Sequence, residues 1–232
     1  MTTQELKSAP DEGFLAHVES VVKHWQALRA RILPTLARLL RSDEESVDET
    51  VELMLRCHDV GKLTALWQAR VSNGQSSLPP HAAIGAAFLF TLPTPDEQIR
   101  NAAAFAIAIH HTDTGLVAAN IESPDALAIA RGLVDETGAL RWHDLARDCA
   151  QNAGLDGERL AGLTVDDLRR MARELRKWFR GASLVEQHVR RLQAGGMHHV
   201  LKICDVRAAA ERDELKYEAQ FVTRLCEGGL IA

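Results

Sequence analysis

The stretch Cys57-His58-Asp59-Val60-Gly61-Lys62 lies at the end of a helical pattern and sets an imidazole beside a carboxylate. Upstream, Val47, Val51 and Met54 recur at helical spacing, and a further step of four residues reaches His58. The histidine is therefore predicted on the buried face of that helix. Because an unpaired polar group away from water costs about 2–7 kcal/mol, this pair needs a partner, either a metal ion or a hydrogen-bonding core residue.

The same dipeptide occurs a second time in the chain, which limits what it proves alone. His143-Asp144 has no glycine or lysine after it. Most buried histidines are hydrogen-bonded core residues and not metal ligands. Evidence for a metal site must therefore come from other parts of the chain.

Length and composition indicate an ordinary globular protein. The 232 residues, 46% hydrophobic and 25% charged, suit a single domain over 1–232, with 1–13 expected to be flexible. A net charge of −5 argues against a protein that coats nucleic acid with its whole surface. A local basic path remains compatible with that charge.

The cysteines and the amino terminus predict a cytoplasmic protein with no membrane partner. Residues 1–13 lack the basic start and apolar run of a secretory signal, and the apolar run 102–109 is too short to span a bilayer. No CxxC pair or spaced framework occurs, so we expect reduced thiols at Cys57, Cys149, Cys204 and Cys226.

Periodicity predicts an all-α fold. Alanine, leucine and arginine dominate, and no convincing alternating strand is present. The long last helix carries Asp205, and breaks are expected at glycines such as Gly195-Gly196. The other expected helices run from Phe14 past Pro34 with a kink or break, over 47–58, shortly after Gly61, after Pro79-Pro80, and over about 96–109, whose apolar part suggests the central helix.

Seven ionisable residues fall on the apolar faces or at the ends of these helices. Adjacent residues on a helix point about 100° apart, so His110 and His111 can reach one ion only where their helix unwinds. The stop signal 112–115 follows them directly. Five imidazoles and two carboxylates exceed the needs of one four-ligand ion, and they are His17, His58, Asp59, His81, His110, His111 and Asp205.

This set of side chains predicts two divalent transition-metal ions. Imidazole-rich sites favour Mn, Fe, Ni or Co over Mg, which prefers oxygen ligands. Two ions about 3.5–4 Å apart can activate water and hold a phosphate ester. One ion is allotted to His17, His58, Asp59 and Asp205, and the other to His81, His110 and His111, with Asp59 as the bridge.

Lys62, directly after Gly61, is placed to contact the scissile phosphate. An exposed lysine without a role in the reaction is the equally supported alternative.

The ordered set of histidines and aspartates, together with Gly61-Lys62, resembles the HD metal-dependent phosphohydrolase superfamily. Within it, the chain is most similar to the HD nuclease of type I CRISPR interference. Further marks are Trp67-Gln68, the segment 81–86 and the doubled histidine at 110–111. The resemblance implies an HD-domain helical bundle that cleaves single-stranded DNA, with Asp59 and Lys62 as catalytic residues and Lys62 and Gln68 as substrate contacts. It also implies two partners, a separate helicase subunit and an RNA-guided surveillance complex.

One departure from the family pattern follows the doubled histidine. The family commonly has glycine there, whereas Thr112-Asp113-Thr114 precede Gly115 in this chain. Asp113 is therefore a candidate for an additional metal ligand.

Two other functions fit the same residues. One is an HD phosphohydrolase that acts on a nucleotide or small phosphate ester, and the other is an inactive HD-like binding module in a larger complex.

A basic cluster over 169–180 is either a solvated helix face or a docking strip for a phosphate backbone or a partner protein. It consists of Arg169, Arg170, Arg173, Arg176, Lys177 and Arg180.

Overall fold

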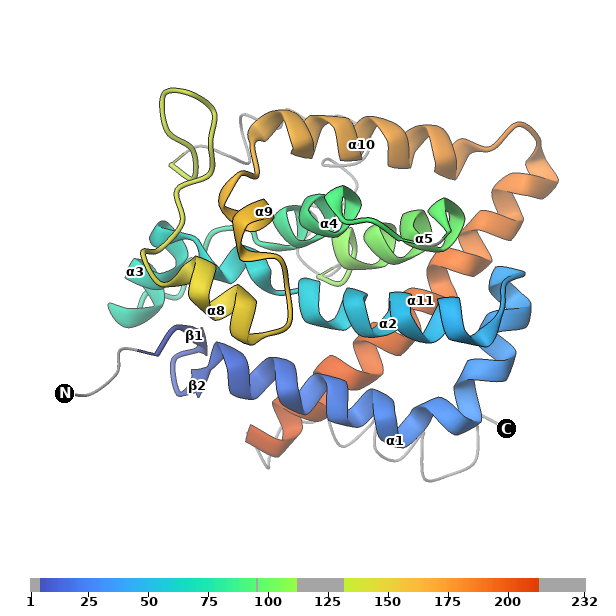
Figure 1. Ribbon diagram of the computed structural model, residues 1–232, viewed down its shortest axis with the longest axis horizontal. Helices are drawn as coiled ribbons and strands as arrows, with labels where there is room; N and C mark the ends of the chain where they lie inside the picture. Colours follow the sequence, from blue (N-terminus) through green and yellow to red (C-terminus); the bar gives the residue numbers. More distant parts are fainter. Residues whose placement is uncertain (1–4, 95, 112–131, 213–232) are drawn as a thin grey trace.

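The computed structural model describes residues 5–94, 96–111 and 132–212, which form a bundle of helices with a small hairpin at the amino end (Figure 1). This confirms the all-α prediction. In chain order the elements are β1 (Lys7–Ala9), β2 (Glu12–Gly13), α1 (Phe14–Leu40), α2 (Glu44–Cys57), the 3-10 helix η1 (Val60–Leu63), α3 (Ala65–Ser72), α4 (Ala82–Thr91), α5 (Glu97–Ala108), α8 (Ala146–Asn152), α9 (Gly157–Ala161), α10 (Val165–Arg180) and α11 (Leu184–Arg212).

The first two helices form as their patterns predict. The α1 stripe Phe14, Val18, Val21 and Trp25 is fully or almost fully buried, and the helix runs through Pro34 without a break. The α2 helix begins where the Asp43 carboxylate accepts a hydrogen bond from the Ser46 backbone N–H at 2.8 Å. Its buried residues face α1, so these two helices form one side of the core.

The α5 helix lies in the centre of the molecule, as its apolar segment predicts. It packs against α2, α4, α10 and α11, and residues 102–108 are buried on all sides. Figure 1 shows α4 and α5 in the middle layer, with α10 on one side and α1 and α2 on the other. No described helix has both the length and the apolar character needed to cross a membrane.

The last helix differs from the prediction, because α11 continues through Gly195-Gly196 without a break. A Cβ atom at Gly196 would lie only 2.6 Å from the Cδ2 atom of Leu39. The missing side chain therefore allows α11 to cross close to α1, and the helix itself is not interrupted.

The structure adds two short strands within residues 7–13, where the sequence shows no alternating pattern. Strands β1 and β2 pair antiparallel, and the flanking Leu6 and the strand residue Ser8 are buried. Two strands of two or three residues are too short to leave an alternating pattern in the sequence.

Among the described cysteines, Cys57 and Cys149 are buried free thiols and Cys204 is buried, whereas Cys226 lies outside the described residues.

Candidate metal centre

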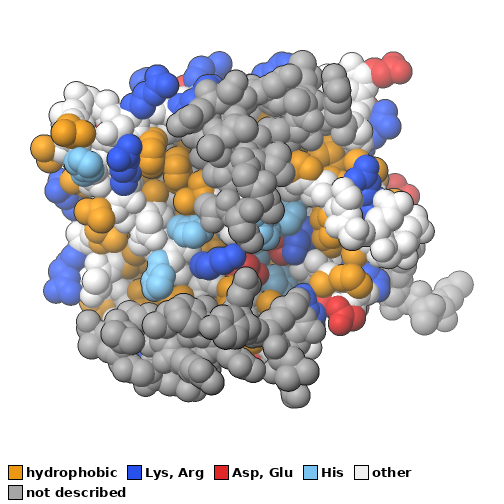
Figure 2. All heavy atoms as spheres, turned by 180° about the vertical axis from the view of Figure 1, so that it is seen from behind, with side chains coloured by type: hydrophobic (Ala, Val, Ile, Leu, Met, Phe, Trp, Pro, Cys, Tyr) orange, Lys and Arg blue, Asp and Glu red, His pale blue; other side chains and the backbone are white. Residues whose placement is uncertain are grey.

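All seven predicted side chains come together in one place, brought there by five separate segments of the chain. Figure 2 shows histidine side chains gathered around acidic and basic side chains on this face of the molecule. The contributing segments are the first turn of α1 with His17, the link between α2 and η1 with His58 and Asp59, the residue before α4 with His81, the end of α5 with His110 and His111, and the middle of α11 with Asp205.

Asp59 lies between two groups of imidazoles and turns one oxygen to each. Its Oδ2 atom is 3.4 Å from Nε2 of both His17 and His58. Its Oδ1 atom is 3.1 Å from Nε2 of His81 and 3.8 Å from Nε2 of His110. The carboxylate can therefore contribute to two sites at once.

Asp205 belongs to the first group. Its Oδ1 atom is 3.3 Å from Nε2 of His17 and 3.7 Å from Nε2 of His58. His17, His58 and Asp59 each offer a ligand atom within 4.8 Å of the others. These side chains are grouped as in the predicted allotment of the first ion.

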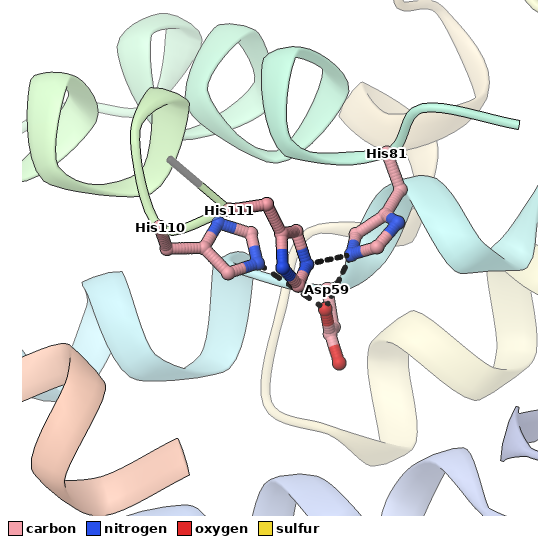
Figure 3. A group of neighbouring side chains, drawn as sticks. All are labelled: Asp59, His81, His110 and His111. Atoms are coloured by element: carbon pink, nitrogen blue, oxygen red, sulfur yellow. Dashed lines mark hydrogen bonds and ion pairs between the residues drawn. The ribbon is translucent and has the colours of Figure 1, made fainter. Parts of the chain in front are cut away.

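The second group lies on the other side of Asp59 (Figure 3). Asp59, His81, His110 and His111 also offer ligand atoms within 4.8 Å of one another. The Nε2 atoms of His81 and His111 are 2.8 Å apart. As predicted, His110 and His111 follow the last residue of α5, where the helix has ended.

His58 and His110 each use Nδ1 in a hydrogen bond to the backbone, so the Nε2 atom of each ring can bind a cation. His58 Nδ1 donates to the carbonyl oxygen of Leu55 at 2.7 Å, and His110 Nδ1 donates to that of Ile107 at 2.6 Å. A carbonyl only accepts, so in the neutral ring Nε2 carries a lone pair.

The Nε2 atoms of these two residues and of His17 are buried and have no hydrogen-bond partner among the described residues. Buried polar atoms of this kind are costly unless something binds them. The residues therefore fit a metal ion.

A carboxylate that the sequence did not indicate contacts His17 on the side of the ring away from Asp59. Its Nδ1 atom donates to Oε1 of Glu12 at 3.2 Å, and Arg212 donates to Oε2 of Glu12 at 2.8 Å. A carboxylate behind a ligating imidazole fixes the orientation of the ring and raises its basicity. Glu12 lies outside any periodic pattern, so no sequence signal indicates this role.

Burial and neighbouring charges shift the pKa of His17 in one direction and the pKa values of His81, His110 and His111 in the other. Burial lowers the pKa of His81 and of His110, and it lowers the pKa of His111 to about 4. The imidazoles of the second group are therefore neutral near pH 7. Burial also opposes the charge on His17, but the neighbouring carboxylates of Asp205 and Glu12 raise its pKa to about 9.

Asp59 remains ionised despite its burial. Burial alone would raise the pKa of this carboxyl, but the charges of His58 and Lys62 and a hydrogen bond from His81 hold it well below its usual range. Both of its oxygens are therefore available to cations.

Lys62 lies at the edge of the centre, with only 14% of its side chain exposed. Its Nζ atom is 2.6 Å from Oδ2 of Asp59 and donates to Oγ of Ser8 at 3.2 Å. This placement differs from that of an idle surface lysine. The same ammonium group lines a cavity of about 320 Å³ that His81 and His111 also line.

Gln68 does not line this cavity. Its side-chain carbonyl accepts from the backbone N–H of Lys7, and its amide nitrogen donates to the carbonyls of Lys7 and Lys62. Gln68 is 4% exposed. Its side chain therefore holds the hairpin against η1 and fixes the backbone of Lys62.

The second His-Asp dipeptide behaves differently from the first. Asp144 is exposed, and His143 Nδ1 accepts a hydrogen bond from the backbone N–H of Leu145 at 3.2 Å. This surface turn takes no part in the centre. Asp113, the candidate additional ligand, lies outside the described residues.

The basic cluster lies on the outer face of α10, whose opposite face is buried. Arg169 pairs with Asp166 and Arg170 with Asp167, each at 2.8 Å, and Arg173 lies 3.8 Å from Glu174. Half of the cluster is thus paired within its own helix, as in a solvated helix face.

Comparisons with known proteins point to one family. The family model described as Cas3, HD domain matches residues 12–220. A CRISPR-associated endonuclease Cas3-HD from Thermoproteus tenax is 29% identical over 209 residues, which cover 86% of this chain and 87% of the relative. A protein of the same description from Methanocaldococcus jannaschii is 26% identical over 117 residues, and the match covers 46% of this chain and 48% of that relative, about half of each.

A solved structure shares the fold. The CRISPR-associated Cas3 HD domain protein from Methanocaldococcus jannaschii matches with a TM-score of 0.66 and 20% identity, covering 85% of this chain and 99% of that one.

Proposed function

Because the chain belongs to the Cas3 HD domain family, whose model matches residues 12–220, we propose that it is a metal-dependent nuclease that cleaves single-stranded DNA in type I CRISPR interference. The observation that carries this proposal is the pair of imidazole groups that share Asp59. Relatives described as CRISPR-associated endonucleases support it.

We assign the ligands of two ions from the grouping of the side chains. His17, His58 and Asp205 would hold the first ion, His81, His110 and His111 the second, and Asp59 would bridge them. The many imidazoles favour Mn, Fe, Ni or Co over Mg. Two such ions, when bound, supply an activated water and stabilise the charge that develops on the phosphodiester oxygens.

The protein's own contribution beyond the ligands centres on Lys62. Its ammonium group, beside Asp59 and at the cavity, can hold a phosphate oxygen of the substrate and stabilise developing negative charge. Gln68 positions Lys62 by donating a hydrogen bond to its backbone carbonyl. A direct contact between Gln68 and the substrate stays a prediction. In this proposal a separate helicase subunit and an RNA-guided surveillance complex deliver the DNA in the cytoplasm.

The direct test compares two kinds of substrate. Purified protein is incubated with circular single-stranded DNA, and separately with a panel of nucleotides, in the presence of Mn²⁺ or Ni²⁺. We expect nicked and degraded DNA and no product from the nucleotides. Product from nucleotides alone would contradict the nuclease proposal.

Asp59→Ala tests the assignment of the bridging ligand. We expect DNA cleavage to fall by more than about 100-fold and at least one ion to be lost. The matched control is Asp144→Ala, which removes the carboxylate of the surface His-Asp dipeptide and should change neither quantity. Full metal occupancy in Asp59→Ala would refute the allotment.

Hydrolysis of a nucleotide or small phosphate ester is the second candidate function. The cavity of about 320 Å³ beside the centre supports it, because small-molecule sites begin at about 300 Å³. The nucleotide panel decides between the two functions. An inert protein that binds no metal would favour a binding module.

A further inference from the structure

The cavity beside the second imidazole group has mostly apolar walls. Ala9 and Pro10 of the hairpin contribute to it, as do Trp67 and the segment 78–80, which contains Leu78, Pro79 and Pro80. Apolar walls of this kind favour a flat or hydrocarbon group over a charged one.

The few polar groups of the cavity lie where it meets the centre. Oγ of Ser8 accepts from Nζ of Lys62 at 3.2 Å and lies 3.4 Å from Oδ2 of Asp59. His81 and His111 line the same cavity and belong to the second imidazole group. The cavity therefore joins an apolar compartment to a site that binds a phosphate in the proposed function.

We propose that this cavity receives the unpaired base of a nucleotide next to the scissile phosphate, so that the base packs against the wall formed by Leu78, Pro79 and Pro80. This inference rests on the proposed function and names the part of the DNA that the site recognises. A phosphate held by Lys62, beside the imidazoles of His81 and His111, would have its attached nucleoside next to the apolar walls. Charge attracts the phosphate, and burial of apolar area retains the base.

The dimensions and chemistry of the cavity predict its selectivity. At about 320 Å³ it lies at the lower end of the size range of small-molecule sites, too small for a stacked duplex. A base within it cannot pair with a second strand, so duplex DNA must first lose pairing at that base. Among the wall side chains, those of the prolines, Leu78 and the alanines offer no hydrogen bonds to base edges, and Trp67 can supply at most one N–H donor. We therefore expect a preference for single strands without a preference for sequence.

Substrates with and without bases test the inference. The full chain, loaded with Mn²⁺, is given a short thymidine oligonucleotide and a strand of equal length in which abasic sites replace the bases. We expect kcat/KM to be about tenfold or more lower for the abasic strand, mainly through a higher KM. Equal values for the two strands would overturn the inference and leave the nuclease proposal intact. Cleavage of neither strand would overturn the proposed function itself.

Leu78→Ala removes part of one wall at a residue that is already 36% exposed, so folding should not suffer. We expect KM for the thymidine strand to rise about three- to tenfold, with kcat and metal content unchanged. The matched control is Leu184→Ala, at an exposed leucine that does not line the cavity, and it should leave KM unchanged. An unchanged KM in Leu78→Ala would count against the base-binding role.

Ala9→Phe fills the cavity from the hairpin side. We expect this variant to bind its metals normally and to lose the preference for the base-carrying strand. Ala69→Phe adds the same bulk at an exposed position outside the cavity and serves as the control. A preference retained in Ala9→Phe, with normal metal content, would contradict the proposal.

Discussion

At the scale of single residues, Asp59 shows how one side chain can serve two sites. Its two oxygens face different imidazole groups, and the residue is only 1% exposed. Nearby positive charge maintains the carboxylate in its ionised form, which is the form that binds cations. The sequence identified this residue because a carboxylate at the end of an apolar helix face needs a partner.

Glu12 offers a test of how the first site is held. Glu12→Gln removes the charge behind His17, so we expect the first ion to bind about 10- to 100-fold more weakly, while the second binds normally. A calorimetric titration of metal-free protein measures both sites. Glu52→Gln, at a glutamate that pairs with Arg56 on α2, is the matched control. Wild-type affinity at both sites in Glu12→Gln would show that Glu12 has no positioning role.

The raised pKa of His17 predicts a pH dependence of the metal-free protein. A folded-state pKa of about 9, above the ordinary value of 6.5, means that the folded state binds the proton more tightly. The added stability is fully present below pH 6.5 and is lost as the pH rises through about 9. We expect the free energy of unfolding to fall by roughly 1–3 kcal/mol across this window.

Urea unfolding in a chelator at several pH values measures this loss. The pKa values of His81, His110 and His111 are lowered, so these residues affect the free energy of unfolding below pH 6.5 and not between pH 6.5 and 9. His17→Gln should remove most of the dependence between pH 6.5 and 9. The same slope in wild type and variant would contradict the assignment.

At the scale of elements, two glycines determine how closely the pieces of the centre approach. A Cβ atom at Gly61 would lie 2.5 Å from the carbonyl oxygen of His81, and one at Gly85 would lie 2.6 Å from the carbonyl oxygens of Cys57 and His58. Backbone atoms at these distances cannot move aside as side chains can. The approach of α4 to the end of α2 therefore depends on the missing side chains.

Gly85→Ala should separate α4 from the end of α2. We expect it to cost about 1–3 kcal/mol of unfolding free energy and to weaken metal binding, because His58 and Asp59 must shift. Gly195→Ala, at a helical glycine with open space around it, should instead add about 0.5–1 kcal/mol. Chemical denaturation with and without metal measures both. A fully stable, metal-binding Gly85→Ala protein would show that the close approach is not required.

The sequence predicted the elements well where the physical signal is local. Helices α1, α2 and α5 each follow from the spacing of neighbouring residues, and α5 ends at Ala108, shortly before His110. The hairpin was missed because strands of three and two residues are too short to show a repeated alternation. The continuity of α11 was missed because the close packing of Gly196 on Leu39 involves residues far apart in the chain.

At the scale of the whole molecule, the convergence of five segments could be predicted, but their distances could not. An ionisable residue on an apolar face must point into the core, and several such residues in one domain must meet there. The sharing of Asp59 between two groups depends on packing between α2, α4 and α5, which no single pattern encodes. The contact of Glu12 with His17 and the walls of the cavity also depend on packing between segments far apart in the chain.

The metal content of the protein tests the central claim most directly. After purification without air, or after loading the chelated protein with Mn²⁺, the wild-type chain should contain close to two ions and Asp59→Ala at most one. Asp144→Ala should match the wild type. A wild-type chain that binds no ion under either condition would contradict the two-metal centre.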